Sequence, residues 1–159
     1  MENQGSYPYA TFLNVAFPQL SVVEAPVLIR DCTDRWYNQT LCKVNDSVIR
    51  LGVMQGEYHC HKHDNDDEFF FVLDGHFIID LEGRSVDLRP REGFVAPKGV
   101  IHRTRAPERA VILMVATAAI IPTGANKCFI NSPSYDDIWN FNKFVMIFVG
   151  RVESAKYQN

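Results

Sequence analysis

Residues 68–88 read EFFFVLDGHFIIDLEGRSVDL, and this stretch decides the fold. Its first two apolar runs flank Asp74-Gly75, a pair that favours a tight hairpin because glycine accepts the positive φ of a primed turn. Glu82-Gly83 supplies a second turn before the next run. Runs of this length between turns are typical of strands. The expected strands are Glu68–Leu73, His76–Leu81 and Ser85–Leu88.

The same pattern continues on both sides of this stretch. Short runs rich in Val, Ile, Phe and Leu alternate with turn residues, and no helical periodicity separates them. Such a series predicts an all-β sandwich or barrel. The further expected strands are Ser47–Met54, Glu57–His63, Gly93–Ala96, Ile101–Arg105 and Ala110–Thr117.

Composition narrows the class of protein. The chain has 159 residues, 47% of them hydrophobic, and a net charge of −3, which fits one globular domain and indicates neither a nucleic-acid nor a membrane partner. We see no signal peptide and no apolar run of roughly 18 residues, so we expect a cytoplasmic protein. The four cysteines form no CxxC pair and are expected to be free thiols.

A histidine-rich segment precedes the hairpin. His59, His61 and His63 alternate with other residues, so in a strand their side chains would share one face. Glu68 follows after a polar turn and would return beside His63. His102, shortly after Pro97-Lys98-Gly99, is the candidate for a fourth ligand from a distant strand.

Imidazole and carboxylate groups suit one divalent transition metal ion, such as Mn, Fe, Co, Ni, Cu or Zn. We therefore predict a metal site formed by His61, His63, Glu68 and His102. Four protein ligands leave a five- or six-coordinate ion with open positions for water or substrate, as a catalytic site requires.

These residues carry a family resemblance. Gly56-x4-His61-x-His63-x4-Glu68-x6-Gly75 resembles the first motif of the cupin superfamily, and Pro97-x-Gly99-x2-His102 resembles the second. Two segments, DDEFFFVLDGHFIIDLEGRSVDL and GFVAPKGVIHRT, are similar in sequence to small single-domain cupins of the mannose-6-phosphate-isomerase-like type. One departure concerns the second motif, because Arg91 stands where a glycine usually opens it.

The resemblance implies an all-β double-stranded β-helix, a jelly-roll cupin barrel, over residues 36–124. Residues 1–35 would form an N-terminal arm with an edge strand or two. Residues 125–159 would form a C-terminal extension that packs on the barrel or on a partner. The apolar stretch Lys143–Val149 in this extension favours a homodimer.

Other residues have less certain roles. His59 is expected to support the ligands or to carry a proton as a catalytic residue, and the alternative is a histidine at the mouth of the barrel. Five side chains are candidates for the substrate pocket: Met54, Phe70, Val72, Thr104 and Leu113.

Three functional hypotheses follow. The first is a metal-dependent oxygenase acting on a phenolic or carbonyl compound. The second is a redox-neutral metal-dependent isomerase, epimerase or cyclase, in which a base such as His59 moves a proton. The third is a metal-containing binding or sensor module without chemistry. The cupin fold does not decide among them, because one fold carries many functions.

Overall fold

The computed structural model describes residues 9–122 and 124. Nearly all of its regular structure is β-strand, as the turn-punctuated sequence predicts. The elements are β1 (Ala10–Phe12), α1 (Ala25–Arg30), β2 (Trp36–Val44), β3 (Ser47–Glu57), β4 (Glu68–Asp74), β5 (Phe77–Leu81), β6 (Arg84–Leu88), β7 (Gly93–Ala96) and β8 (His102–Thr117).

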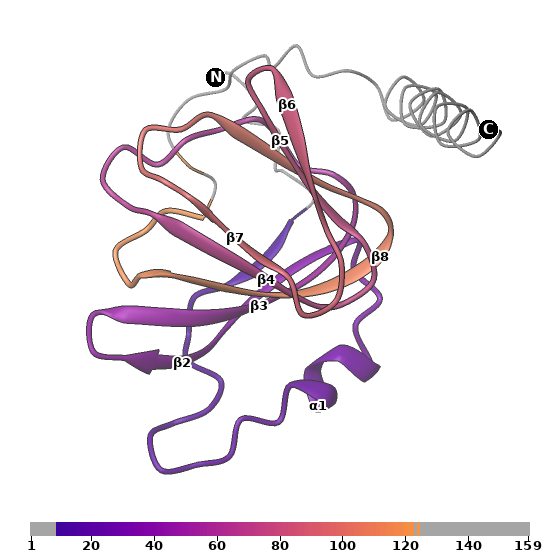
Figure 1. Cartoon of the computed structure of the whole chain (residues 1–159). Helices are drawn as coiled ribbons and strands as arrows, with labels where there is room; N and C mark the ends of the chain where they lie inside the picture. Colours follow the sequence, from indigo (N-terminus) through magenta and orange to yellow (C-terminus); the bar gives the residue numbers. More distant parts are fainter. Residues whose placement is uncertain (1–8, 123, 125–159) are drawn as a thin grey trace, which may run out of the picture.

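The strands curl around a common interior (Figure 1). Their order is β1-β2-β3-β8-β4-β7, and β5 joins β8 on one edge and β6 on the other. Strand β8 is therefore shared by two parts of the sheet. Within the described residues the sheet does not close by hydrogen bonds. The arrangement is the jelly-roll barrel expected from the sequence.

The predicted strand Glu57–His63 is wrong. Strand β3 runs through Gln55 and ends at Glu57, and the following residues are irregular except for an isolated bridge between His61 and His102. Gly56 has φ +102, a conformation that L side chains rarely adopt, and it lies at a register shift after which only Gly56 and Glu57 still pair with β8 within β3.

Strand β8 merges two predicted strands. Residues 107–109 bulge out between the pair Gly56–Ala106 and the pair Met54–Ala110. Pro107 lies in this bulge, where its missing N–H breaks no ladder bond. The prediction of two separate strands, Ile101–Arg105 and Ala110–Thr117, is therefore wrong, because both belong to β8.

The N-terminal arm covers the outer face of the sheet. A buried cluster of Leu41, Leu51, Val53 and Val111 packs against Phe17, Leu28 and Ile29, from α1 and the chain before it. Figure 1 shows α1 outside the barrel, on the side of β2 and β3. This helix was not expected from the sequence. Of the described residues, none belongs to a helix with the length and apolar character that a membrane crossing requires.

The turn at Arg91 resolves the departure from the second motif. Arg91 adopts φ +75, the left-handed conformation that glycine would take there. Its N–H donates to the carbonyl of Val72 at 2.9 Å, and the Val72 N–H donates to the carbonyl of Glu92 at 3.0 Å. The turn is therefore kept without glycine.

The expectations for the cysteines and for the C-terminal extension have different outcomes. Cys60 is disulfide-bonded, so the expectation of free thiols is wrong for this residue, whereas Cys32 and Cys42 are free. Sequence spacing does not show which thiols approach each other in a fold. The C-terminal extension, including Lys143–Val149, lies outside the described residues. The division of the chain at residues 35 and 124 stays a prediction.

Candidate metal centre

Four buried side chains converge inside the barrel. One ligand atom from each of His61, His63, Glu68 and His102 lies within 4.8 Å of the other three. Nε2 of His63 is 3.4 Å from a carboxylate oxygen of Glu68, and Nε2 of His102 is 3.7 Å from the same oxygen. Within residues 9–122 and 124, neither ring nitrogen has a hydrogen-bond partner. Three imidazoles and a carboxylate with their ligand atoms this close fit one cation.

Backbone hydrogen bonds bring the two sequence motifs together. The N–H of His61 donates to the carbonyl of His102, and the N–H of His102 donates to the carbonyl of His61, each at 2.9 Å. The Gly99 N–H donates to the carbonyl of His63 at 2.7 Å. Asp67, in the acidic turn, accepts a hydrogen bond from the Lys98 N–H at 2.8 Å. The turn before His102 is therefore held against the ligand segment.

The same backbone sets the tautomers of two ligands. Nδ1 of His61 is 3.0 Å from the carbonyl oxygen of His59, and Nδ1 of His102 is 3.0 Å from that of Val100. A carbonyl oxygen only accepts, so both Nδ1 atoms carry the proton. In each neutral ring, Nε2 then has its lone pair available for a metal ion.

Two members of the cluster, His61 and Glu68, have pKa values shifted toward the protonation states that metal binding requires. Burial, together with the neighbouring His102, lowers the pKa of His61 to about 3. Burial alone would raise the pKa of Glu68, but interactions with His102 and His63 outweigh it and lower the pKa to about 2. At neutral pH, His61 is a neutral donor and Glu68 is an anion, as metal coordination requires.

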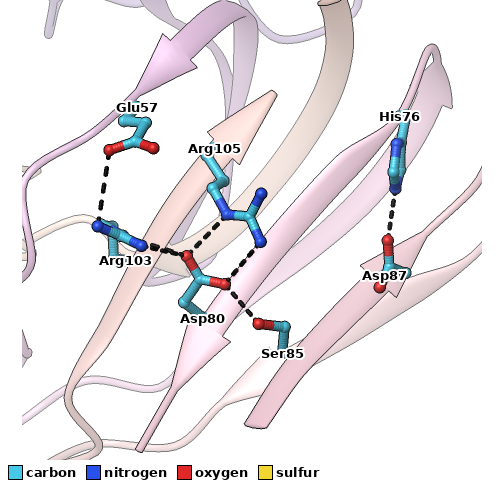
Figure 2. A network of polar contacts seen from close by, with 7 residues as sticks. All are labelled: Glu57, His76, Asp80, Ser85, Asp87, Arg103 and Arg105. Atoms are coloured by element: carbon cyan, nitrogen blue, oxygen red, sulfur yellow. Dashed lines mark hydrogen bonds and ion pairs between the residues drawn. The ribbon is translucent and has the colours of Figure 1, made fainter. Parts of the chain in front are cut away.

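An ion-pair network joins the outer face of β8 to β5, through Arg103 and Arg105 on β8 and Asp80 on β5 (Figure 2). Asp80 on β5 is fully buried and accepts hydrogen bonds from Arg103, at 2.8 and 3.1 Å, and from Arg105, also at 2.8 and 3.1 Å. Ser85 donates to the same carboxylate at 2.6 Å. Because successive residues of a strand face opposite sides, the residues that alternate with these arginines, His102 and Thr104, point inward.

A pocket opens onto the cluster, with about 430 Å³ of empty space that includes the solvent at its mouth, and both His61 and Glu68 form part of its wall. Much of the rest is aromatic or thioether: Tyr9, Trp36, Tyr37, Tyr58, Phe70, Met54 and Met114. Thr11, Asn38, Thr104 and Pro122 complete the lining. Such a wall suits a small, flat, largely apolar ligand.

The structure places the predicted pocket residues unevenly. Met54, Phe70 and Thr104 line the pocket. Val72 does not, because it is fully buried in the core behind the wall. Leu113 faces the other side of the sheet and packs against the outer cluster, while its neighbour Met114 faces the pocket. Because successive residues of a strand face opposite sides, Met114 lies on the pocket face and the predicted residue Leu113 does not.

His59 does not join the ligands. Its ring packs against Tyr58, with ring centroids 4.3 Å apart, and is absent from both the four-residue cluster and the pocket wall. The expected alternation of His59 with His61 fails because no strand runs through residues 58–60. Its backbone carbonyl accepts a hydrogen bond from Nδ1 of His61, and its ring lies beside the His61 ring, with ring centroids 5.1 Å apart.

Several wall residues were missed in the sequence. Trp36 and Asn38 belong to β2, and Tyr9 lies just before β1. Both strands lie in the N-terminal part of the sequence, whose composition is mixed and gives no clear strand pattern. The signal that could have found them is the alternation Trp36-x-Asn38-x-Thr40, which places three side chains on one face if a strand is assumed.

A jelly-roll barrel with three histidines and one glutamate converging in its interior defines the class of cupin proteins. The family model described as "Cupin domain" matches residues 49–116. An uncharacterized Bacillus subtilis protein, YdbB, is 36% identical over 89 residues, which span 55% of this chain and 79% of that protein. The chain belongs to the cupin family.

Solved structures agree with this assignment. A cupin-2 domain containing protein from Shewanella frigidimarina is 28% identical, with a TM-score of 0.57, over 59% of this chain and 92% of its own. Protein NMB1881 from Neisseria meningitidis is 21% identical, with a TM-score of 0.55, over 61% of this chain and 99% of its own. The second likeness concerns the fold alone.

Proposed function

We propose that the protein is a metal-dependent enzyme acting on a small organic molecule, and specifically an oxygenase of a phenolic or carbonyl compound. One observation carries the proposal: Nε2 of His63 and Nε2 of His102 are buried beside Glu68 and have no hydrogen-bond partner among the residues that the structure describes. Buried polar atoms left unpaired are costly, so these nitrogens fit a cation that accepts their lone pairs.

A divalent ion bound there would act as a Lewis acid on substrate oxygen or, as iron, supply redox chemistry with dioxygen. The ion belongs to the set Fe, Mn, Co, Ni, Cu and Zn, which the ligand types suit. The carbonyls of His59 and Val100 orient two of its ligand rings. Thr104, buried beside the cluster, offers a hydroxyl to a substrate oxygen.

The wall of the pocket supports an oxygenase over a redox-neutral isomerase. Proton transfer in an isomerase needs a positioned base near the substrate carbon. Apart from the proposed metal ligands His61 and Glu68, the described residues of this wall include no His, Asp, Glu or Lys. His59, the base expected from the sequence, is not among its residues. Chemistry centred on the metal ion needs no such base.

The aromatic wall supports a flat substrate. The rings of Trp36 and Tyr58 pack at a tilt of 42°, with centroids 5.1 Å apart, and Phe70 contacts His102 edge-on with centroids 6.1 Å apart. A phenol or an enolised carbonyl compound would pack against these rings while its oxygen faces the histidine cluster.

The test begins with elemental analysis of the protein purified without added metal, repeated on His61→Ala. We expect about one metal ion per chain in the wild type and a strong loss in the variant. Oxygen consumption is then measured with phenolic and dicarbonyl compounds, with and without air. Turnover that is unchanged without oxygen would exclude the oxygenase and favour the isomerase. Tight ligand binding with no turnover across the panel would favour a sensor module.

A further inference from the structure

A row of polar side chains inside the barrel has atoms with no partner. Thr40 Oγ1, Asn38 Oδ1, and both Nε and Nη1 of Arg50 are buried and make no hydrogen bond within the described residues. Arg50 is 5% exposed and Thr40 is 1% exposed. The two residues are direct partners across β2 and β3. A buried cation and a buried hydroxyl therefore lie side by side, both unsatisfied.

This row belongs to the same interior face as the pocket. Arg50 is also the direct partner of Met114 on β8, and Met114 is the direct partner of Phe70 on β4. Directly opposed residues of antiparallel strands project to the same side. Met114 and Phe70 both line the pocket, as does Asn38. The Arg50 side chain therefore projects into the barrel beside the pocket, although it is not itself a wall residue.

The charge of Arg50 is not neutralised by a contact. Burial lowers the pKa of Arg50, and the carboxylate of Glu68 raises it, which places the guanidinium within electrostatic reach of the metal centre. No ion pair with Arg50 occurs in the described part of the chain. By contrast, Arg103 and Arg105 share the carboxylate of Asp80 (Figure 2). A buried guanidinium without a counter-ion is strongly unfavourable, so an anion is the expected partner.

The charges around the pocket select the kind of anion. Among the described residues the wall contains neither Lys nor Arg, so within this part of the chain Arg50 is the cation nearest in the fold to an anionic ligand in the pocket. Glu68 contributes a nearby negative charge that disfavours a doubly charged group. A carboxylate carries a single charge and accepts charge-assisted hydrogen bonds from guanidinium nitrogens. A carboxylate is therefore a better match than a phosphate.

We propose that the substrate carries a carboxylate group, which binds Arg50 and accepts a hydrogen bond from the Thr40 hydroxyl. The rest of the molecule packs against Phe70 and Met114 and directs its reacting oxygen toward the histidine cluster. The inference rests on the proposed function, because it assigns the substrate class to the same pocket. Within the proposed class of phenolic and carbonyl substrates, it selects aromatic or enolic carboxylic acids.

Two probes of equal size test the proposal. Binding of benzoate and of neutral benzamide to the full-length zinc-loaded protein is followed by calorimetry and by tryptophan fluorescence, to which the wall residue Trp36 contributes along with Trp139. We expect benzoate to bind at least about tenfold more tightly than benzamide. Arg50→Gln should remove this preference, and Arg50→Lys should keep part of it. Arg84→Gln, which removes an exposed positive charge, is the matched control and should change nothing.

The same titrations on chelator-treated protein separate this inference from the metal proposal. A benzoate preference that survives metal removal supports Arg50 even if the metal proposal fails. A preference that appears only with zinc, and persists in Arg50→Gln, assigns the carboxylate to the ion and overturns the Arg50 site. If Arg50→Gln does not fold, Thr40→Val replaces it, with a several-fold loss for benzoate alone expected. Equal binding of both probes to metal-free wild type also overturns the inference.

Discussion

Nε2 of His63 lies 3.4 Å from a carboxylate oxygen of Glu68, at the two ends of the acidic turn 64–67. The turn reverses the chain, so that the buried side chains of His63, before it, and Glu68, after it, lie next to each other. Asp67 stabilises this geometry through the Lys98 N–H, which ties the turn to the segment before His102. Three separate parts of the chain are therefore joined at the cluster.

His102→Ala is expected to abolish stoichiometric metal binding, whereas His59→Ala is expected to keep it. Loss of a partner that only supports a ligand costs roughly 10- to 100-fold in metal affinity, and loss of a ligand costs more. The His59 carbonyl, which holds His61, remains in the alanine variant. Zinc or iron content after dialysis, measured by elemental analysis, checks the pair. Equal metal content in the two variants would contradict the assignment of ligands.

Gly124→Ala is expected to disturb His61. A Cβ at Gly124 would lie 2.6 Å from Cδ2 of His61, and the backbone has φ +63. Gly83→Ala is the matched control, because Gly83 has φ +75 but a Cβ there would meet nothing within 4 Å. Both variants should lose about 1 kcal/mol of stability from backbone strain. Only Gly124→Ala should also lower metal affinity, measured by competition with a chelating dye.

Asp80→Asn is expected to destabilise the fold by about 3 kcal/mol at neutral pH, because it leaves the largely buried Arg105 without its counter-ion. Asp87→Asn is the control: the His76–Asp87 pair, also in Figure 2, is more exposed and worth little. Urea unfolding at neutral pH measures both. Similar effects of the two substitutions would contradict a structural role for the Asp80 network.

The Asp80 contribution should also depend on pH. Burial raises the pKa of Asp80, but hydrogen bonds from Arg105, Ser85 and Arg103 lower it below its ordinary value of 3.8. A carboxyl whose pKa is depressed in the folded state stabilises the fold above its unfolded pKa, and the benefit is lost as pH falls through the folded pKa. The stability gap between wild type and Asp80→Asn should therefore be constant above about pH 5 and shrink below about pH 4. A gap that stays constant down to about pH 2 would count against this account.

Arg91→Gly is expected to stabilise the protein slightly. A left-handed conformation costs a side chain about 1–2 kcal/mol, and the greater backbone entropy of glycine offsets part of the gain. The expected rise in Tm is about 2 °C. Asn45→Gly, at φ 53, is the control, because asparagine tolerates this conformation and should gain less. A fall in Tm for Arg91→Gly would show that the arginine side chain has a stabilising contact.

The homodimer expected from the sequence stays a prediction, and one surface offers a direct test. Phe69 and Val95 are paired on the outer face of β4 and β7. The side chain of Val95 is 48% exposed, and that of Leu73 is 40% exposed. Val95→Lys should convert a dimer to a monomer in gel filtration with light scattering. Leu20→Lys, at a fully exposed site, should leave it unchanged. A wild-type monomer would contradict the prediction at once.

The sequence by itself determined the cupin fold and the four residues of the buried cluster. Turn residues between apolar runs decide strand boundaries locally, which is why Glu68–Leu73 and Gly93–Ala96 agree with β4 and β7 to within one residue. The motif residues His61, His63, Glu68 and His102 were identified from their spacing and their family resemblance, and the structure brings these four together.

Only the tertiary structure decided which side chains surround the cluster. The irregular backbone after Gly56 removed His59 from the ligand face, and the bulge at 107–109 joined two predicted strands into β8. Trp36, Asn38 and Arg50 reach the interior because β2 and β3 pair in one particular register. Register depends on contacts between distant segments, and local propensity carries no information about it.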